Sequence, residues 1–277
     1  MKTLQQFSTP ILMPVLFPNT ERAYRNKVLY GDCIAEMRGM PGGFVDLIIT
    51  DPPFAIDFGA QRSNYNRKGG RVLEGYNEIS ANDYLNFTRQ WITQSFRVLK
   101  ENGSMYVFSG WNNLKDILTA LDEAGFTTVN HIIWKYQFGV VTKIKYVTSH
   151  YHCLFVVKNK KKWKFNSFSR FSKEQRTEQG GSAHYKDKED VWYIPREYWN
   201  GDEKTPTKLP AEVIRKILTY SSDENDLIMD PFLGSGQVAV VAKEMKRAYL
   251  GVEIVPEYHD FIMRRLNSGQ YRIKSKK

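Results

Sequence analysis

Apolar residues occur along the chain in two kinds of run, which predict two kinds of element. Short, nearly continuous apolar runs are typical of strands covered on both faces; they span residues 27–32, 45–50, 104–110, 128–138, 149–158, 226–230 and 247–254. Runs with apolar residues at about every third or fourth position are typical of helices; they span residues 33–40, 80–100, 114–126, 208–222, 237–245 and 256–266. Because strands and helices alternate, we predict an α/β fold with a mostly parallel sheet, in which two consecutive strands form an antiparallel hairpin at the edge.

Three segments depart from this pattern. Residues 1–26 are predicted to be an irregular N-terminal arm, because prolines interrupt their apolar run. Residues 60–76 are polar, basic and interrupted by glycine, which indicates a loop. Residues 136–204 include the second strand of the hairpin and then lose their periodicity. We expect them to be an insertion between the two parts of one catalytic and cofactor-binding domain, residues 27–135 and 205–277.

The composition fits a packed globular core and argues against several classes of protein. Hydrophobic residues make up 42% of the chain and aromatic residues 14%, unlike a disordered chain. The two cysteines, Cys33 and Cys153, lie far apart and form no CxxC pair. This argues against a disulfide framework or a structural zinc site and fits a reducing cytoplasm. Because no run reaches the ~18 apolar residues of a membrane span, we expect a cytoplasmic protein.

The positive charge of the chain is concentrated in one segment. The net charge is +10, and residues 135–176 alone contain eleven lysines and arginines against one acidic residue, Glu174. Aromatic residues are interleaved with these charges. Because basic side chains release counterions from phosphates and aromatic faces stack on bases, the segment favours a nucleic-acid partner. For residues 158–164 taken alone, a solvated lysine-rich surface is the alternative.

A short motif, Asp51-Pro52-Pro53-Phe54, follows the apolar strand 45–50. Aspartate and proline are common turn residues, so a turn alone would account for it. Ligands nevertheless bind outside the carboxyl ends of the strands in open α/β sheets. The motif is therefore also a candidate catalytic site.

A second motif follows the apolar strand 226–230. Residues 234–239 read GSGQVA, which matches a GxGxxG/A loop opening a helix, and Glu253 ends the next strand. Such glycines let the backbone approach a nucleotide, and the acid binds ribose hydroxyls; an ordinary glycine turn is the alternative. Asp230, at the mouth of the loop, would repel a pyrophosphate. A cofactor with a cationic end and no phosphate, such as S-adenosylmethionine, therefore suits the loop better than NAD.

The two motifs together resemble those of the DNA amino-methyltransferases, whose cofactor loop reads FxGxG and whose catalytic motif reads [DNS]PP[YFW]. Here the catalytic motif comes first, the basic segment follows and the cofactor loop comes last. This order resembles the permuted β group, which includes many restriction-modification enzymes, and the resemblance covers roughly residues 27–266. It implies a Rossmann-like methyltransferase fold with a circularly permuted motif order. It also implies S-adenosyl-L-methionine as the cofactor and methyl transfer to a base in a specific duplex sequence.

The resemblance further implies a set of cofactor-binding residues. They are Asp32, Cys33, Asp51, Thr207, Lys208, Asp230, Pro231, Phe232, Gly234, Ser235, Gly236, Glu253 and Ile254. In the family, the residue matching Asp32 contacts adenine and the one matching Glu253 binds the ribose. An HPTQKP-like family segment corresponds to residues 205–210, which lack the leading histidine and place Lys208 one position early. For Lys208, the simple start of a helix is an equal alternative.

At the catalytic motif, the resemblance implies roles for Asp51, Pro52, Pro53 and Phe54. The amino group of adenine or cytosine is a poor nucleophile because the ring delocalises its lone pair. A carboxylate that accepts its N–H turns that lone pair towards the methyl group, and the prolines hold a neighbouring carbonyl rigidly as second acceptor. Phe54 offers a stacking face for a base flipped out of the helix. Positioning then supplies the rate without a metal, and aspartate in the first position favours adenine N6 over cytosine N4.

Residues 136–204 occupy the place of the family's target-recognition region, and the loop 60–76 is expected to close over DNA. The basic residues expected to contact DNA are Arg62, Arg67, Lys68, Arg71, Lys143, Lys145, Lys160, Lys161, Lys162 and Arg170. Both segments have solvated loops as their alternative. His150 and His152 alternate on a predicted strand, and we interpret them as structural or DNA-facing.

Duplex DNA is the partner that the resemblance implies, together with a homodimer and a cognate restriction endonuclease acting separately. Three rivals remain open. An RNA base amino-methyltransferase is disfavoured by the motif order, since most RNA enzymes place the cofactor loop first. A non-catalytic nucleic-acid-binding subunit is disfavoured by the intact motifs, and an NAD-linked oxidoreductase by the lack of hydride-transfer residues.

Overall fold

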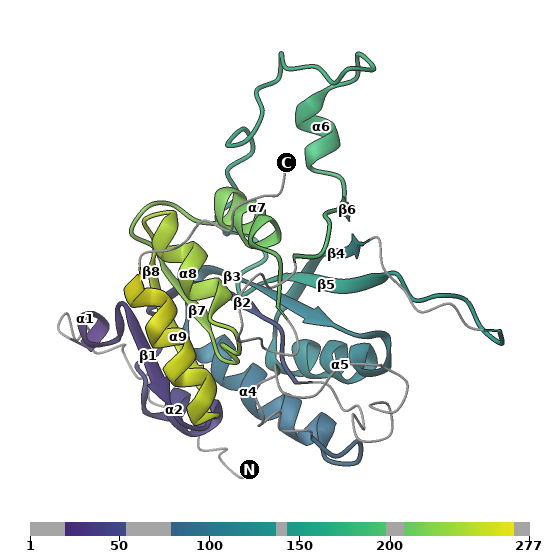
Figure 1. The fold of residues 1–277 in the computed structure, drawn as a ribbon. Helices are drawn as coiled ribbons and strands as arrows, with labels where there is room; N and C mark the ends of the chain where they lie inside the picture. Colours follow the sequence, from purple (N-terminus) through teal and green to yellow (C-terminus); the bar gives the residue numbers. More distant parts are fainter. Residues whose placement is uncertain (1–19, 54–78, 137–142, 198–207, 269–277) are drawn as a thin grey trace, which may run out of the picture.

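The computed structural model describes residues 20–53, 79–136, 143–197 and 208–268, which form one mixed sheet with helices on both faces (Figure 1). The strand order in the sheet is β1-β8-β7-β2-β3-β5-β4-β6. In chain order the strands are β1 (Lys27–Tyr30), β2 (Val45–Thr50), β3 (Leu99–Ser109), β4 (Thr127–Lys135), β5 (His150–Val157), β6 (Val191–Tyr193), β7 (Leu227–Asp230) and β8 (Ala248–Glu253). Neighbouring strands run parallel except beside β5, which is antiparallel to both β3 and β4.

The helices form two layers. In chain order they are α1 (Thr20–Tyr24), α2 (Cys33–Gly39), α4 (Tyr84–Val98), the 3₁₀ turn η2 (Trp111–Asn113), α5 (Leu114–Ala124), α6 (Ala183–Asp187), α7 (Ala211–Ser221), α8 (Gln237–Glu244) and α9 (Pro256–Ser268). Figure 1 shows the helices on the two faces of the sheet. Buried side chains of α7, α8 and α9 join one hydrophobic core, and those of α2, α4 and α5 join another. The sheet therefore separates two cores, as in a doubly wound α/β fold.

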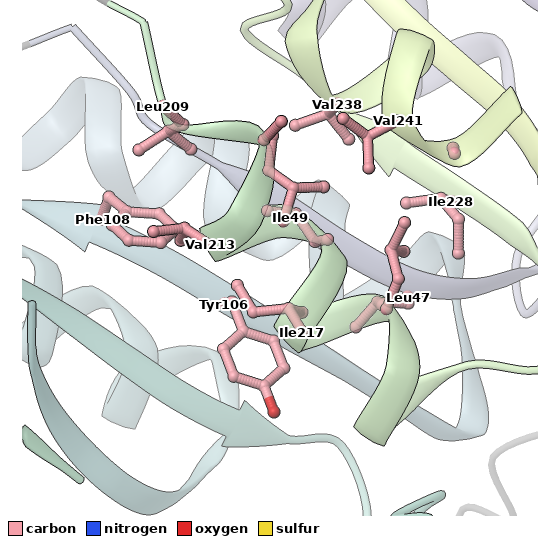
Figure 2. Close-up of a cluster of buried hydrophobic side chains, with 14 of the residues drawn as sticks. Leu47, Ile49, Tyr106, Phe108, Leu209, Val213, Ile217, Ile228, Val238 and Val241 are labelled. Atoms are coloured by element: carbon pink, nitrogen blue, oxygen red, sulfur yellow. The ribbon is translucent and has the colours of Figure 1, made fainter. Parts of the chain in front are cut away.

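The central strand β2 explains why the sequence shows a continuous apolar run. Leu47 and Ile49 belong to the core beneath α7 and α8, where Figure 2 shows them beside Ile228 and Val213. Ile48, between them, belongs to the opposite core. Successive strand residues point to opposite faces, so a strand covered on both faces needs apolar residues at every position.

The predicted hairpin is confirmed, but its place in the sheet differs. β4 and β5 pair antiparallel, with Lys135 opposite His150. β6 then pairs parallel to the outer side of β4, so the hairpin is not at the edge. β6 is only three residues long, and such a short segment shows no periodicity in the sequence.

Two further differences concern segments predicted to be irregular. Residues 20–24, assigned to the N-terminal arm, form α1. Within the predicted insertion, β6 joins the main sheet, and Trp192 of β6 is 7% exposed in the core shared with α7. The side chain of Asp187 also contacts Lys216 and Tyr220 of α7. No helix in the part of the chain described here is long and apolar enough to span a membrane.

Candidate active site

The two sequence motifs meet at one edge of the sheet. β2 and β7 are parallel neighbours, with Ile48 opposite Met229, so Asp51 and Asp230 lie at the same carboxyl edge. A cavity of about 190 Å³ opens there, between the segments that follow β1, β2, β7 and β8. The predicted site residues that line it are Asp32, Cys33, Asp51, Pro52, Pro53, Lys208, Asp230, Pro231, Phe232, Gly234, Ser235, Glu253 and Ile254. Their roles in binding and catalysis stay predictions.

Some predicted residues lie elsewhere. Gly236 does not line the cavity, and Phe54 and Thr207 lie outside the described residues. Sequence reasoning also missed several residues that do line it, among them Phe87 of α4 and Gln237 of α8. Gln237 directly follows the glycine loop, so its place in the motif could have indicated it, whereas nothing in the sequence joins Phe87 to the site.

The glycine loop has the backbone that its sequence predicts. Gly234 and Gly236 have φ values of +51° and +75°, which L residues with side chains rarely adopt. A Cβ on Gly236 would lie 2.9 Å from the Cγ1 and Cγ2 atoms of Ile262 in α9. Gly236 therefore lets α8 start directly after the loop with α9 packed against it.

Glu253, at the end of β8, is fixed by the loop opposite. Its Oε2 accepts a hydrogen bond from the Gly234 N–H at 2.7 Å, and its Oε1 accepts one from Val255 N–H at 2.8 Å. The side chain is buried, which raises its pKa, although the backbone hydrogen bonds oppose the shift. The carboxylate is thus held in one orientation at the cavity wall. Asp32 is similarly fixed, because its Oδ1 caps α2 by accepting from Ala35 N–H at 2.9 Å.

Asp230 lies between the two motifs. Its Oδ1 accepts hydrogen bonds from the Thr50 hydroxyl at 2.9 Å and from the Phe232 N–H at 3.0 Å. Burial raises its pKa, the nearby carboxylates of Asp51 and Glu253 contribute to the rise, and the two hydrogen bonds oppose it, which leaves the pKa at about 7. Three acidic groups at one site favour a ligand with a positive charge, because it relieves their repulsion.

Asp51 has a buried oxygen without a partner. Its Oδ1 accepts no hydrogen bond from the described residues. Burial raises the pKa of Asp51 to about 7, and the positive charge of Arg196 opposes that shift. Pro52 and Pro53 continue the chain along the cavity wall. The arrangement leaves a carboxylate oxygen that could accept a hydrogen bond from a ligand in the cavity.

The end of the cavity near α7 contains a buried ion pair. The ammonium of Lys208 lies 2.6 Å from Oε1 of Glu197, and its side chain is 2% exposed. Burial lowers the pKa of Lys208, and Glu197 opposes this shift. Glu197 also accepts from Ala211 N–H at 2.7 Å and from Gln237 Nε2 at 3.3 Å. Sequence reasoning did not predict Glu197, because it lies in the insertion without periodicity.

The residues predicted to contact DNA differ in their exposure to solvent. Lys143, Lys145 and Lys160–Lys162 are exposed. Arg170 is half-buried, with Nε 3.1 Å from Oδ2 of Asp187 and Nη2 2.9 Å from Oε1 of Glu212. Arg62, Arg67, Lys68 and Arg71 lie outside the described residues.

His152, one of the two histidines singled out in the sequence, packs against a neighbouring histidine. Nε2 of His131 lies 2.7 Å from Nδ1 of His152, which is buried. Burial, together with the neighbouring histidines His131 and His150, lowers the pKa of His152 to about 4. The described residues contain no group of three or more histidine, cysteine, aspartate or glutamate side chains arranged to hold a metal ion.

Comparison with known proteins identifies the family. A family model described as DNA methylase matches residues 45–264. The chain belongs to this DNA methylase family. Among similar proteins, the type II methyltransferase M2.LlaDCHI of Lactococcus lactis subsp. cremoris is 32% identical over 236 residues, covering 81% of this chain and 83% of that protein. The DNA adenine methyltransferase YhdJ of Escherichia coli (strain K12) is 29% identical over 259 residues, covering 88% and 83%.

Solved structures of methyltransferases share the fold of this DNA methylase. The M1.HpyAVI–SAM complex is 25% identical, with a TM-score of 0.60 over 87% of this chain and 98% of that one. The cytosine-N4-specific PvuII DNA methyltransferase is 18% identical, with a TM-score of 0.68 over 87% and 86%. At that identity the second likeness concerns the fold alone. The Rossmann-like methyltransferase fold predicted from the sequence is confirmed.

Proposed function

We propose that this DNA methylase transfers a methyl group from S-adenosylmethionine to the exocyclic amino group of a flipped-out base in a specific duplex sequence, with adenine N6 preferred over cytosine N4. The observation that carries the proposal is the buried Oδ1 of Asp51, which has no hydrogen-bond partner among the described residues and belongs to a residue that lines the cavity. A buried acceptor without a partner is costly unless a ligand satisfies it. An amino N–H of a base is a matching donor.

The cavity fits S-adenosylmethionine by charge. Asp230 and Glu253 offer carboxylates to a cofactor with cationic groups and ribose hydroxyls, and Asp32, which also lines the cavity, is the residue we assign to the adenine. Lys208 supplies a positive charge for the carboxylate end. The bound cofactor supplies the methyl group. The M1.HpyAVI structure, described as a SAM complex, supports this assignment.

The apolar part of the cavity fits the same ligand. The ring of Phe232 lies between those of Phe87 and Trp91, with centroids 5.8 and 5.5 Å away. Phe87, Phe232 and Ile79 line the cavity, and so does Tyr258 of α9. These side chains give the cavity an apolar wall, beside which the carboxylates interact with a cationic ligand more strongly than in bulk water.

In the proposed reaction, ionised Asp51 accepts one amino hydrogen of the base and orients the nitrogen lone pair towards the methyl group. Its neighbour Pro52 is buried, which keeps the backbone after Asp51 rigid. Phe54 would stack on the base, a role that falls on a residue outside those described here. Since Asp51 must be ionised to act as a charged acceptor, its pKa of about 7 makes the reaction dependent on pH near neutrality.

Two observations support the choice of adenine. Aspartate occupies the first position of the DPPF motif, which in the resembling family is more often associated with adenine N6. YhdJ, with 83% of its length aligned, is named a DNA adenine methyltransferase. The likeness to the cytosine-N4-specific PvuII enzyme concerns the fold and leaves the base undecided. We further propose duplex DNA as the partner, a homodimeric assembly, and a cognate restriction endonuclease that acts separately.

The test is transfer of labelled methyl from S-adenosylmethionine to duplex DNA, followed by digestion and nucleoside analysis. We expect N6-methyladenine at one sequence. N4-methylcytosine would keep the mechanism and overturn the preferred base. Label in RNA but not in DNA would support an RNA base methyltransferase, and no label in either would support a binding subunit without catalysis.

A further inference from the structure

The segment that follows β6 is anchored at the carboxyl edge of the sheet. β6 pairs with β4, and the indole N–H of Trp134 donates a 2.7 Å hydrogen bond to the carbonyl of Ile194. The next residues, Arg196 and Glu197, therefore leave the sheet at the same edge that carries the active site. They belong to the basic insertion and not to either motif.

Glu197 does not line the cavity but contacts residues that do. Its carboxylate accepts from three donors on two other elements: Lys208 Nζ at 2.6 Å, Ala211 N–H at 2.7 Å and Gln237 Nε2 at 3.3 Å. Lys208 and Gln237 line the cavity, whereas Glu197 does not. A glutamine could not replace it, because one end of its amide is a donor and would face these donors. Glu197 also lies at the N-terminus of α7, where a negative charge is favourable.

Arg196 lies above the same face of the sheet as Asp51. Its guanidinium carbon is 4.1 Å from the ring centroid of Tyr136 and 5.8 Å from that of Tyr151. Asp51 continues β2 on the face of Ile49, and the register β2–β3–β5 leads from it through Phe108 to β5. Strands lie about 4.8 Å apart, so Asp51 is two strands from β5 on this face, and Arg196 interacts with it electrostatically.

The charged and titratable groups around Asp51 come from three elements. Asp230, the last residue of β7, raises the cost of the negative charge on Asp51, and Cys153 of β5 interacts with Asp51 electrostatically. Arg196, after β6, supplies the opposing positive charge. Among the described residues, the favourable charge on Asp51 thus comes from the insertion.

We propose that Arg196 and Glu197 of the insertion are positioning residues for the active site. Glu197 acts on the part that binds the cofactor, and Arg196 acts on the part that binds the base. Glu197 holds Lys208 and Gln237 in place for the cofactor, and Arg196 supplies a positive charge that favours the carboxylate form of Asp51. This inference rests on the proposed function and extends it. It assigns roles to a pair of consecutive residues that neither motif contains.

The first experiment tests Glu197 by binding of S-adenosylmethionine to the full chain without DNA, measured by calorimetry. We expect Glu197→Gln to raise the dissociation constant for S-adenosylmethionine about tenfold. Glu197→Asp should give an intermediate value. Glu212→Gln, on the same helix start but paired with Arg170, is the matched control and should bind like wild type. Binding of Glu197→Gln within twofold of wild type would overturn the role, and if that variant does not fold, unchanged binding by Glu197→Asp would do so.

The second experiment tests Arg196 by the carboxyl ¹³C shift of Asp51 against pH in the cofactor-free protein, assigned with Asp51→Asn. Arg196→Met should move the midpoint to higher pH, because a positive charge that favours the ionised form is lost. Arg196→Lys keeps the charge and should stay near wild type, whereas a merely structural role would not move the midpoint. An identical midpoint in Arg196→Met and wild type would overturn the role.

The two experiments separate this inference from the proposed function. Both are read without DNA, so a wild-type protein that binds the cofactor but methylates no DNA overturns only the proposed substrate. A wild-type protein that binds no S-adenosylmethionine overturns the proposed function and the role of Glu197 together. The titration of Asp51 still decides the role of Arg196.

Discussion

The hydroxyl of Thr50 donates a 2.9 Å hydrogen bond to Oδ1 of Asp230, which joins the ends of two strands whose residues are 180 positions apart. This bond brings the catalytic motif and the cofactor loop together. Asp51 follows Thr50 directly, so its carboxyl and that of Asp230 lie close enough to raise the cost of ionisation. The site is therefore built to receive a positive charge between two acids. The predictions below follow from this arrangement.

Replacing Asp51 should stop the reaction but spare the cofactor site. We expect Asp51→Asn to lower the rate of methyl transfer by at least ~100-fold, because a neutral amide is a weaker acceptor. The dissociation constant for S-adenosylmethionine should change only a few-fold. Asp122→Asn, on the exposed surface of α5, is the control. A near wild-type methylation rate in Asp51→Asn would show that another group activates the base.

Replacing Asp230 should stabilise the cofactor-free protein. The pKa of Asp230 is raised to about 7 by burial, so its ionised form destabilises the fold at pH 8 and protonation relieves this as the pH falls through 7. Asparagine keeps an acceptor for Thr50 and Phe232 without the charge. We expect Asp230→Asn to raise the unfolding free energy by on the order of 1–3 kcal/mol at pH 8.

The same comparison at pH 5 is the internal control. There Asp230 is already protonated in the folded protein, so the variant and wild type should unfold at closer temperatures. Cofactor binding at pH 8 should weaken, because the cationic ligand loses one carboxylate. A variant less stable than wild type at pH 8 would contradict the assigned burial cost.

A side chain at Gly236 should separate α9 from the loop. Gly236→Ala places a Cβ 2.9 Å from Ile262 in a left-handed conformation, whereas Gly43→Ala has a similar φ of +67° and no atom within 4 Å. We expect urea unfolding to show a loss of ~2–4 kcal/mol at Gly236 against ~1 kcal/mol at Gly43. The double variant with Ile262→Ala should show a favourable coupling between the two changes. Equal losses at the two glycines would rule out the clash.

The exposed lysines should dominate the salt dependence of DNA binding. We expect the triple change of Lys160, Lys161 and Lys162 to glutamine to weaken binding and lower the salt slope by up to ~3, since each phosphate contact contributes about one. Arg170→Gln should instead reduce stability, because Arg170 pairs with Asp187 and Glu212. A triple variant with an unchanged slope would place DNA elsewhere.

Much of the fold could be predicted because it is encoded locally. The run VDLIIT gives β2, since each of its positions enters one of two cores. The glycines of GSGQVA fix a backbone that only glycine adopts easily, and so predict the loop before α8. β6 and α1 could not be predicted in this way, because three and five residues are too few to show a period in the sequence.

The sequence by itself determined the alternation of strands and helices, the two motifs and the concentration of positive charge, because each depends on neighbouring residues. Only the tertiary structure decided that Asp51 and Asp230 share one edge, that Glu197 lies behind Lys208 and that Arg170 pairs within the protein. These contacts join segments that are distant in the chain. Strand order and side-chain packing create them, and no local pattern of polarity records which distant partner a residue will meet.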